Sequence, residues 1–321
     1  MGPNARGAVF ALTGFAVFAT HDLIVKVLGG AYNPIQILFY SVLFGFPLVA
    51  LMLIRDATPG HLRPEHPWWV ALRTLAAVVT GSAAFYAFAN LPLAQVYTII
   101  FAAPLFITIL AIPILGERVR LRRWAAVIVG LCGVLVVLRP GSTDLTLAHM
   151  AALVAAFGSA LASIISRKIG QDERTAVLIL YPMLGNFAVM FALLPFVHVP
   201  MPVGDLALNA GLAVLGFVAA ALMIEAYRAG EAVIVAPMQY SQIIWATLFG
   251  ALFFDEGLDG PTLVGASIII ASGLYIVVRE GRANASENRP VSSTRTRFET
   301  GTWPRIDALI RLARKRSKTR G

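Results

Sequence analysis

The sequence has one cysteine, Cys132, and few charged residues, which make up only 13% of the chain. A single cysteine cannot form a disulfide within the chain or supply a cluster of thiolates for a metal ion. The five histidines are scattered at positions 21, 61, 66, 149 and 198, and no metal-ligand spacing, nucleophile elbow or phosphate-binding glycine loop occurs. The sequence therefore predicts a protein that is not an enzyme, binds no metal or cofactor and does not itself hydrolyse ATP.

Apolar residues are abundant: 58% of the chain is hydrophobic, and the mean hydropathy is +0.76. About ten apolar segments between residues 7 and 278 are long enough to cross a bilayer, which takes roughly 17 to 25 residues in a helix. Because lipid cannot hydrogen-bond to peptide groups, we expect these segments to be helices, so the fold class is an all-α integral membrane protein with ten transmembrane helices. The expected spans are 7–28, 34–54, 68–90, 93–115, 121–138, 146–166, 175–197, 205–228, 231–253 and 259–278.

The net charge of +9 is concentrated at one end of the chain, because almost all of the excess Lys and Arg residues follow Val278. When the loops are assigned alternately to two sides, most basic loop residues fall on one side. Positively charged loops remain in the cytoplasm, so both termini are predicted to be cytoplasmic and the chain to lie in the inner (plasma) membrane. Residues 280–321 then form a basic cytoplasmic tail, which we expect to contact anionic lipid headgroups rather than nucleic acid.

The two halves of the hydrophobic region are similar to each other at a shift of roughly 140 residues. Aligned pairs include Lys26 with Lys168, Glu117 with Glu256 and Gly133 with Gly273. Each unit, 7–139 and 146–279, holds five expected spans, and an odd number of crossings turns the second copy upside down. Two inverted five-helix repeats are typical of secondary transporters, in which a central site is exposed to each side in turn.

The stretch Ala87–Ala94, followed by Pro104 and Gly116–Glu117, resembles the EamA group of the drug/metabolite transporter superfamily. Its counterpart in the second half is Ala226–Ala232 followed by Asp255–Glu256. The resemblance covers nearly all of residues 7–279 and implies a ten-helix transporter of small molecules. It is specific for the family and does not define the substrate.

Two positions differ from many members of that family. Phe18–Ala19 stands where many have Trp–Gly, and Tyr40 stands where many have Arg. Both lie on helices that line the family's cavity, so the substrate of amino-acid exporters cannot be transferred to this chain. The pattern from Phe18 to Lys26 is more similar to branches that contain importers of riboflavin and S-adenosylmethionine.

The first span carries His21 and Asp22, and an ionisable side chain in hydrocarbon needs a partner or water. One interpretation makes Asp22 a site for a proton or for a cationic substrate, with His21 able to titrate near neutral pH. The alternative is a local ion pair between Asp22 and Lys26, which are four residues apart in the favourable helical order.

Three further candidates lie near helix ends. Arg73 could pair with Glu225 or bind a carboxylate or phosphate group of a substrate. Alternatively, it is an ordinary basic residue at a cytoplasmic helix end. Glu225 either faces the cavity or extends to the interface beside Arg228. Tyr86 either belongs to an outer gate or is an interfacial aromatic residue.

The ninth span contains a cluster of polar and aromatic residues near its middle: Gln239, Tyr240, Gln242 and Trp245. Gln239 and Gln242 are three residues apart and share a helix face, which Trp245 extends by another turn. This face could hydrogen-bond and stack a planar substrate, or it could join neighbouring helices. We favour the substrate-binding interpretation because so many donors lie at the expected depth.

These observations predict a secondary transporter that moves a small polar organic metabolite, such as a vitamin or nucleoside-like compound, with coupling to protons as a further hypothesis. An amino-acid or drug exporter and a membrane scaffold without transport activity are the alternatives. A homodimer is compatible with the sequence. Neither the substrate nor the direction of transport follows from the sequence.

Overall fold

The computed structural model describes residues 2–55, 62–116, 121–140, 145–170, 172–230 and 232–281. Its elements in chain order are α1 (Pro3–Gly29), α2 (Pro34–Arg55), α3 (Pro67–Asn90), α4 (Leu93–Ile100), α5 (Ala103–Leu115), α6 (Leu121–Leu138), α7 (Leu147–Ile169), α8 (Thr175–Leu193), η1 (Leu194–Phe196), α9 (Val203–Ala229), α10 (Ala232–Val235), η2 (Ala236–Tyr240), α11 (Ser241–Phe254) and α12 (Gly260–Gly281). The basic tail that the sequence predicts lies outside the described residues.

The described chain is helical wherever the sequence is strongly apolar, as expected for peptide groups that must satisfy one another in lipid. Seven helices in this part of the chain are long and apolar enough to cross a membrane, and two shorter apolar helices are Trp124–Leu138 and Gly260–Ile276. The seven are Asn4–Gly29, Pro34–Leu51, Pro67–Asn90, Leu93–Leu115, Leu147–Ile169, Thr175–Phe196 and Val203–Ala229. The prediction of an all-helical membrane protein is confirmed.

Two of the expected spans are interrupted at proline. The span 93–115 is divided into α4 and α5 just before Pro104, and the span 231–253 is divided into α10, η2 and α11 around Pro237. Proline lacks a backbone N–H and clashes with the preceding turn, so an interruption at these positions is expected. Pro113 and Pro182, in contrast, lie inside continuous helices.

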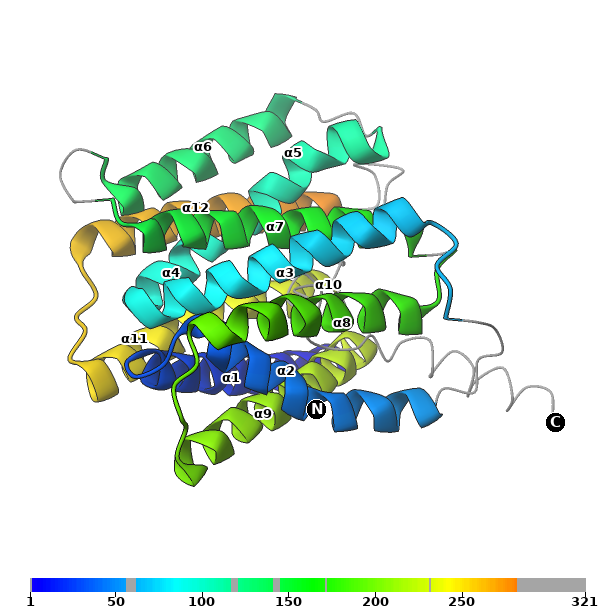
Figure 1. Ribbon diagram of the computed structural model, residues 1–321. Helices are drawn as coiled ribbons and strands as arrows, with labels where there is room; N and C mark the ends of the chain where they lie inside the picture. The colour runs from blue at the N-terminus through cyan, green and yellow to red at the C-terminus, as the bar shows by residue number, and fades with distance from the viewer. Residues whose placement is uncertain are drawn as a thin grey trace.

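The helices lie side by side, with α5 and α6 along one edge of the bundle and α9 along the opposite edge (Figure 1). The most extensive contacts join α1 to α9, α3 to α7, and α6 to α12. Glycine permits the close approach of α6 and α12, because a Cβ atom at Gly265 would lie 2.7 Å from the carbonyl oxygen of Gly133. Helices that are distant in sequence therefore form the closest pairs.

Polar contacts gather at the two ends of the bundle, which we name after one residue in each. The Lys26 end contains the side-chain contacts of Lys26 with Glu256, Arg139 with Asp259, Tyr32 with Asp205, and Gln95 with His149. The Arg73 end contains those of Arg73 with Ser166, Lys168 with the Ile114 carbonyl, and Glu173 with the backbone N–H of His66. Between these ends lies a mostly apolar interior.

Candidate functional site

A cavity of about 130 Å³ lies inside the bundle, between the two ends. Its walls come from α1, α3, α4, α5, α7, η2 and α11, so both halves of the chain contribute. One water molecule needs only about 10 to 15 Å³ of such volume, so this cavity can hold several waters or part of a small molecule. The cavity therefore has a mostly apolar wall that carries a few polar side chains inside the bundle.

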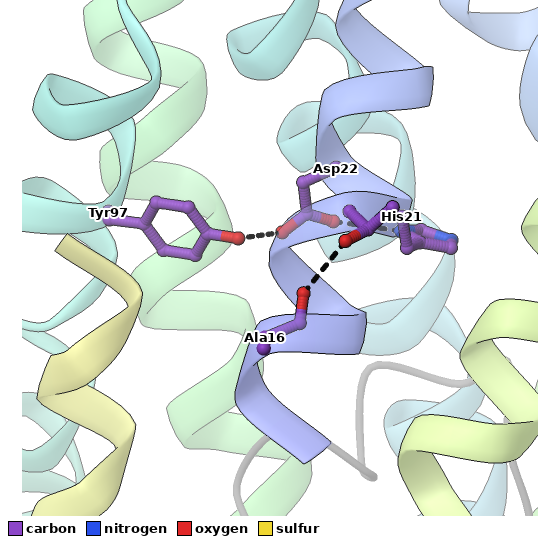
Figure 2. Close-up of polar contacts among 5 residues, drawn as sticks. Ala16, His21, Asp22 and Tyr97 are labelled. Atoms are coloured by element: carbon purple, nitrogen blue, oxygen red, sulfur yellow. Dashed lines mark hydrogen bonds and ion pairs between the residues drawn. The ribbon is translucent and has the colours of Figure 1, made fainter. Parts of the chain in front are cut away.

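Asp22 is the acidic residue among the described residues that line this cavity. Its carboxylate contacts Nδ1 of His21 at 2.8 Å and accepts a hydrogen bond from the hydroxyl of Tyr97. Figure 2 shows Tyr97 pointing toward Asp22 from α4, with the His21 ring on the other side of the carboxylate. All three side chains are buried, and Asp22 is only 3% exposed. Hydrogen bonds from the protein thus compensate for part of the lost hydration of the carboxylate.

Two amide side chains, Gln239 of η2 and Gln242 of α11, line the same cavity. Thr80 of α3 and Ser159 of α7 add hydroxyl groups. Two of these groups are deeply buried, with Thr80 1% and Gln242 3% exposed, and neither Thr80 Oγ1 nor Gln242 Nε2 has a hydrogen-bond partner in the described structure. A buried donor without a partner costs about 1 to 3 kcal/mol, so both atoms are suited to bind a ligand or water.

Aromatic rings form much of the remaining wall. Phe15 and Phe18 of α1, Phe85 and Phe88 of α3, and Phe101 after α4 line the cavity. The rings contact the polar groups directly: His21 lies edge-on to Phe85 with centroids 6.1 Å apart, and Phe88 lies edge-on to Tyr97 at 5.3 Å. Such a wall can stack on a flat ligand, and the ring faces attract positive charge.

The structure brings together four of the nine residues that the sequence singled out: His21, Asp22, Gln239 and Gln242. The other five lie outside the lining of this cavity. Tyr240 is directly behind the wall, because its ring lies edge-on to Phe101 at 5.1 Å. Trp245 is half-buried and packs against Phe249, and Tyr86 is 37% exposed.

Arg73 lies at the junction of α3, α7 and α8 and is 5% exposed. Its Nε donates to Ser166 Oγ and its Nη1 donates to the Leu178 carbonyl, both at 2.5 Å. Glu225 lies near the end of α9 and pairs with Arg228 at 2.5 Å, with both side chains more than two-fifths exposed. Glu225 therefore lies beside Arg228, as in one of the two alternatives that the sequence analysis gave for it.

Lys26, which the sequence offered as a partner of Asp22, forms an ion pair with Glu256 at 2.5 Å. Its Nζ also donates to the Leu91 carbonyl at 2.5 Å and lies 5.0 Å from the centre of the Phe254 ring. Glu256 accepts a hydrogen bond from the backbone N–H of Leu93, at the start of α4. Glu256 therefore binds the N-terminus of α4 rather than that of the helix that follows it, α12. Glu117 lies outside the described residues.

Sequence reasoning did not identify Thr80, Tyr97 or the phenylalanine wall as parts of this cavity. Threonine and phenylalanine are ordinary residues in a membrane helix, so no pattern in the sequence separates those that face a cavity. Among the described residues, no group of three or more His, Cys, Asp or Glu side chains is arranged to hold a metal ion.

A helical membrane protein with a cavity between its two ends, lined by aromatic rings and a few polar groups, has the architecture of a small-molecule carrier. The model of the EamA-like transporter family matches residues 5–139 and 146–279, nearly all of the described chain. The chain therefore belongs to the EamA-like transporter family and is a small-metabolite transporter.

Three relatives show the range of this family. The chain is 24% identical to an S-adenosylmethionine uptake transporter of Rickettsia prowazekii over 88% of this chain and 96% of the relative. It is 26% identical to a riboflavin transporter of Vibrio cholerae, over 88% of this chain and 96% of the relative. It is 24% identical to a pseudopaline exporter of Pseudomonas aeruginosa, over 83% of this chain and 94% of the relative.

The fold is also found in a solved crystal structure of another protein. That structure matches with a TM-score of 0.58 at 18% identity, and the match covers 87% of this chain and 99% of the other. At this identity the similarity concerns the fold alone.

Proposed function

We propose that this protein is a secondary transporter that carries a vitamin or nucleoside-like metabolite across the plasma membrane by alternating access. The observation that carries the proposal is the buried cavity, where Asp22, Thr80 and Gln242 lie among aromatic rings. The S-adenosylmethionine and riboflavin relatives are named for compounds that contain a flat heterocycle joined to a hydroxyl-bearing group, a ribose ring in the first and an open ribityl chain in the second. Aromatic walls and amide groups are suited to such molecules.

The chain path supports ten crossings arranged as two inverted repeats, 7–139 and 146–279. Contacts at the ends of the bundle are consistent with α1 running from the Arg73 end to the Lys26 end and α7 running the opposite way. Gly116, the neighbour of Glu117, follows α5 at the Arg73 end, whereas Glu256 lies at the Lys26 end. The two separate matches of the family model fall on the same two units.

The helix contacts support the same arrangement. If the two units are equivalent, α1 corresponds to α7 and α3 corresponds to α9. The contact of α1 with α9 then has its counterpart in the contact of α7 with α3, and both are among the most extensive in the bundle. The α6 and α12 helices correspond to each other and form a pair of their own. This is the pattern that an internal two-fold axis in the membrane plane would produce.

The distribution of charge supports a cytoplasmic location for the Arg73 end and for both termini. Basic residues cluster around the Arg73 end: Arg6, Arg63, Arg167, Lys168, Arg174 and Arg228. Positively charged loops are retained in the cytoplasm. The Lys26 end, which carries the ion pair between Lys26 and Glu256, is then external.

Flux into proteoliposomes tests the proposal. Purified full-length protein should move at least one compound from a panel that includes riboflavin and S-adenosylmethionine, down its gradient and without ATP, whereas protein-free liposomes should not. Asp22→Asn should reduce this flux at least tenfold, and Asp205→Asn, which changes an acid outside the cavity, should preserve it. Uptake that strictly requires ATP hydrolysis would contradict a secondary transporter.

Proton coupling through Asp22 and His21 is the second part of the proposal. Both side chains line the cavity and contact each other, and Asp and His side chains inside a membrane are typical of proton relays in transporters. An imposed pH gradient should therefore drive accumulation of the substrate in the wild type and fail to do so in Asp22→Asn. Identical accumulation with and without the gradient would show that protons are not coupled to transport.

Export is the second candidate, and the pseudopaline exporter among the relatives favours it. Cells that express an importer should rescue auxotrophs for its substrate. Cells that express an exporter should instead gain resistance to toxic analogues. The same strain can be used for both assays, with Asp22→Asn as the inactive control in each.

A further inference from the structure

Among the described residues that line the cavity there is one acidic side chain and no lysine or arginine. Among the described residues that line it, Asp22 supplies a carboxylate, and His21 is the one side chain that can carry a positive charge, when it is protonated. Lys26 is one helical turn away along α1, but its ammonium group is bound by Glu256 and by the Leu91 carbonyl at the Lys26 end. The cavity therefore offers a carboxyl group, and no lysine or arginine of its described lining, to whatever enters it.

The two side chains that contact Asp22 need not neutralise it. A neutral imidazole can donate through Nδ1, and the hydroxyl of Tyr97 donates as a neutral group. An ionised carboxylate accepts up to about four hydrogen bonds, so a ligand can approach it in addition to these two donors.

The walls next to the carboxylate are aromatic. Phe18 is four residues before Asp22 on α1, and Phe85, Phe88 and Phe101 line the cavity from α3 and the end of α4. A cation over an aromatic face is attracted by about 0.5 to 2 kcal/mol, depending on how far it is desolvated. A carboxyl group in the same cavity as several aromatic rings is suited to a diffuse cation, such as a sulfonium or quaternary ammonium group, which has no strongly bound water shell to lose.

Two buried donors lie in the same cavity. Thr80 Oγ1 and Gln242 Nε2 are without a hydrogen-bond partner in the described structure, and both side chains are at least 97% buried. Both atoms can donate to the ring nitrogens or carbonyl oxygens of a heterocycle. The cavity thus combines a group that recognises positive charge with groups that recognise the acceptor atoms of a flat ring.

We infer that the cavity selects a heterocyclic substrate that carries a positive charge beside the ring system, of the sulfonium or quaternary ammonium class, over a neutral flat molecule of similar size. This inference rests on the proposed transport function and narrows its substrate. A neutral flavin would stack on the phenylalanine wall but would leave the charge of Asp22 without a countercharge. A sulfonium nucleoside uses the wall, the donors and the carboxylate together.

A pair of ligands that differ in charge at one atom tests the inference. S-adenosylmethionine carries a sulfonium, and S-adenosylhomocysteine is the neutral thioether with the same adenosine and amino-acid parts. Binding of both to purified full-length protein in lipid nanodiscs would be measured by calorimetry. We expect the sulfonium compound to bind at least tenfold more tightly to the wild type, and Asp22→Asn to reduce this ratio to about two or less.

The matched control is Asp205→Asn, which removes a carboxylate at the Lys26 end, where Asp205 is bound by Tyr32 outside the cavity. This variant should keep the tenfold ratio. Equal binding of the two compounds to the wild type, a preference that survives in Asp22→Asn, or no binding of either compound to folded protein would each overturn the inference. Flux of a neutral metabolite in the panel described above would still uphold transport, so the two failures can be distinguished.

Discussion

Asp22 illustrates how the bundle tolerates a buried charge. Its carboxylate lies among apolar helices, where an unpaired ion would be very unfavourable, and the protein supplies His21 on the same helix and Tyr97 from another. The contact with Tyr97 crosses from α1 to α4, so the carboxylate also connects two helices that line the cavity. A residue suited to bind a substrate is therefore also a structural contact.

The contribution of the Tyr97 hydroxyl to transport can be separated from that of the Tyr97 ring. Tyr97→Phe keeps the aromatic contacts with Phe88 and Phe101 and removes one hydrogen bond to a charged group, which is worth about 1.5 to 3 kcal/mol. We expect the transport rate at low substrate concentration to fall at least tenfold, measured as initial flux in proteoliposomes. Tyr275→Phe, on an exposed tyrosine of α12, should leave the rate unchanged. An unchanged rate in Tyr97→Phe would show that the hydroxyl is not needed.

Arg73 is predicted to stabilise the fold rather than to bind substrate, because it joins α3 to Ser166 of α7 and to the Leu178 carbonyl of α8. Arg73→Lys keeps the charge but cannot reproduce two directed guanidinium contacts. We expect a loss of about 1 to 3 kcal/mol in stability, seen as a lower Tm in detergent. The substrate KM of the protein that remains folded should be unchanged.

The exposed pair of Arg228 and Glu225 provides the comparison for this prediction. Arg228→Lys should change stability by less than about 0.5 kcal/mol, because exposed ion pairs contribute little. A raised KM without a change in Tm in Arg73→Lys would place Arg73 in the substrate path instead.

Single residues also show what could be inferred before the structure. The unfavourable energy of an ionisable group in lipid identified both Asp22 and Arg73, but that argument states only that a partner exists. For Asp22 the surroundings include a cavity, whereas for Arg73 they are a hydroxyl and a carbonyl from neighbouring helices. Which kind of partner a residue has depends on helix rotation and packing, and the sequence does not contain these directly.

At the scale of elements, the helices that contribute to the cavity include the interrupted ones. Gln239 lies in η2 and Gln242 in the first turn of α11, next to the break near Pro237. Tyr97 and Phe101 lie at the end of α4, next to the break before Pro104. The sequence predicted apolar membrane helices because apolar length is a local property, and the missing N–H of proline accounts for the breaks near Pro104 and Pro237. It could not predict that Pro113 and Pro182 would stay within continuous helices, because neighbouring helices decide this.

The packing of α6 on α12 depends on glycine and can be tested directly. A Cβ atom at Gly265 would overlap Val137 and lie 2.7 Å from the Gly133 carbonyl oxygen, which is backbone and cannot rotate away. Gly265→Ala should therefore destabilise the protein by about 1 to 3 kcal/mol, measured by thermal unfolding in detergent.

The matched control for Gly265 is Gly211→Ala on α9, where the added methyl group would meet no atom within 4 Å. That variant should keep the Tm or raise it slightly, because alanine is the better helix former by about 1 kcal/mol. Equal Tm values for the two variants would show that the α6 and α12 helices do not approach as closely as described.

At the scale of the whole molecule, contacts at the Lys26 end join three parts of the chain. Lys26 of α1 pairs with Glu256 before α12, and the two residues bind the Leu91 carbonyl and the Leu93 N–H between α3 and α4. These contacts lie about one helical turn, roughly 6 Å, beyond Asp22 along α1. Alternating access requires that they separate when the cavity opens toward this end.

Removal of this ion pair should expose the cavity from the Lys26 end. In a Cys132→Ser background, Ser159→Cys places a thiol in the cavity wall, and its reaction with a membrane-impermeant reagent is measured from each face of the membrane. The combination of Lys26→Met with Glu256→Gln should increase the labelling rate from one face about tenfold. Lys168→Met, which removes a lysine at the opposite end, should not increase labelling from that same face. An unchanged rate in the folded double variant would show that the pair does not restrict access.

The extensive contacts of α1 with α9 and of α3 with α7 also constrain how the molecule is made. The ribosome delivers α1 to α6 to the membrane before α7 and α9 have been synthesised. The first helices must therefore remain in the bilayer with polar side chains such as Arg73 and Lys26 still lacking the contacts that Ser166 and Glu256 later provide. The final helix packing therefore forms only after the last helices have been inserted. Until then, lipid, water or a chaperone must shield the polar groups of the first half.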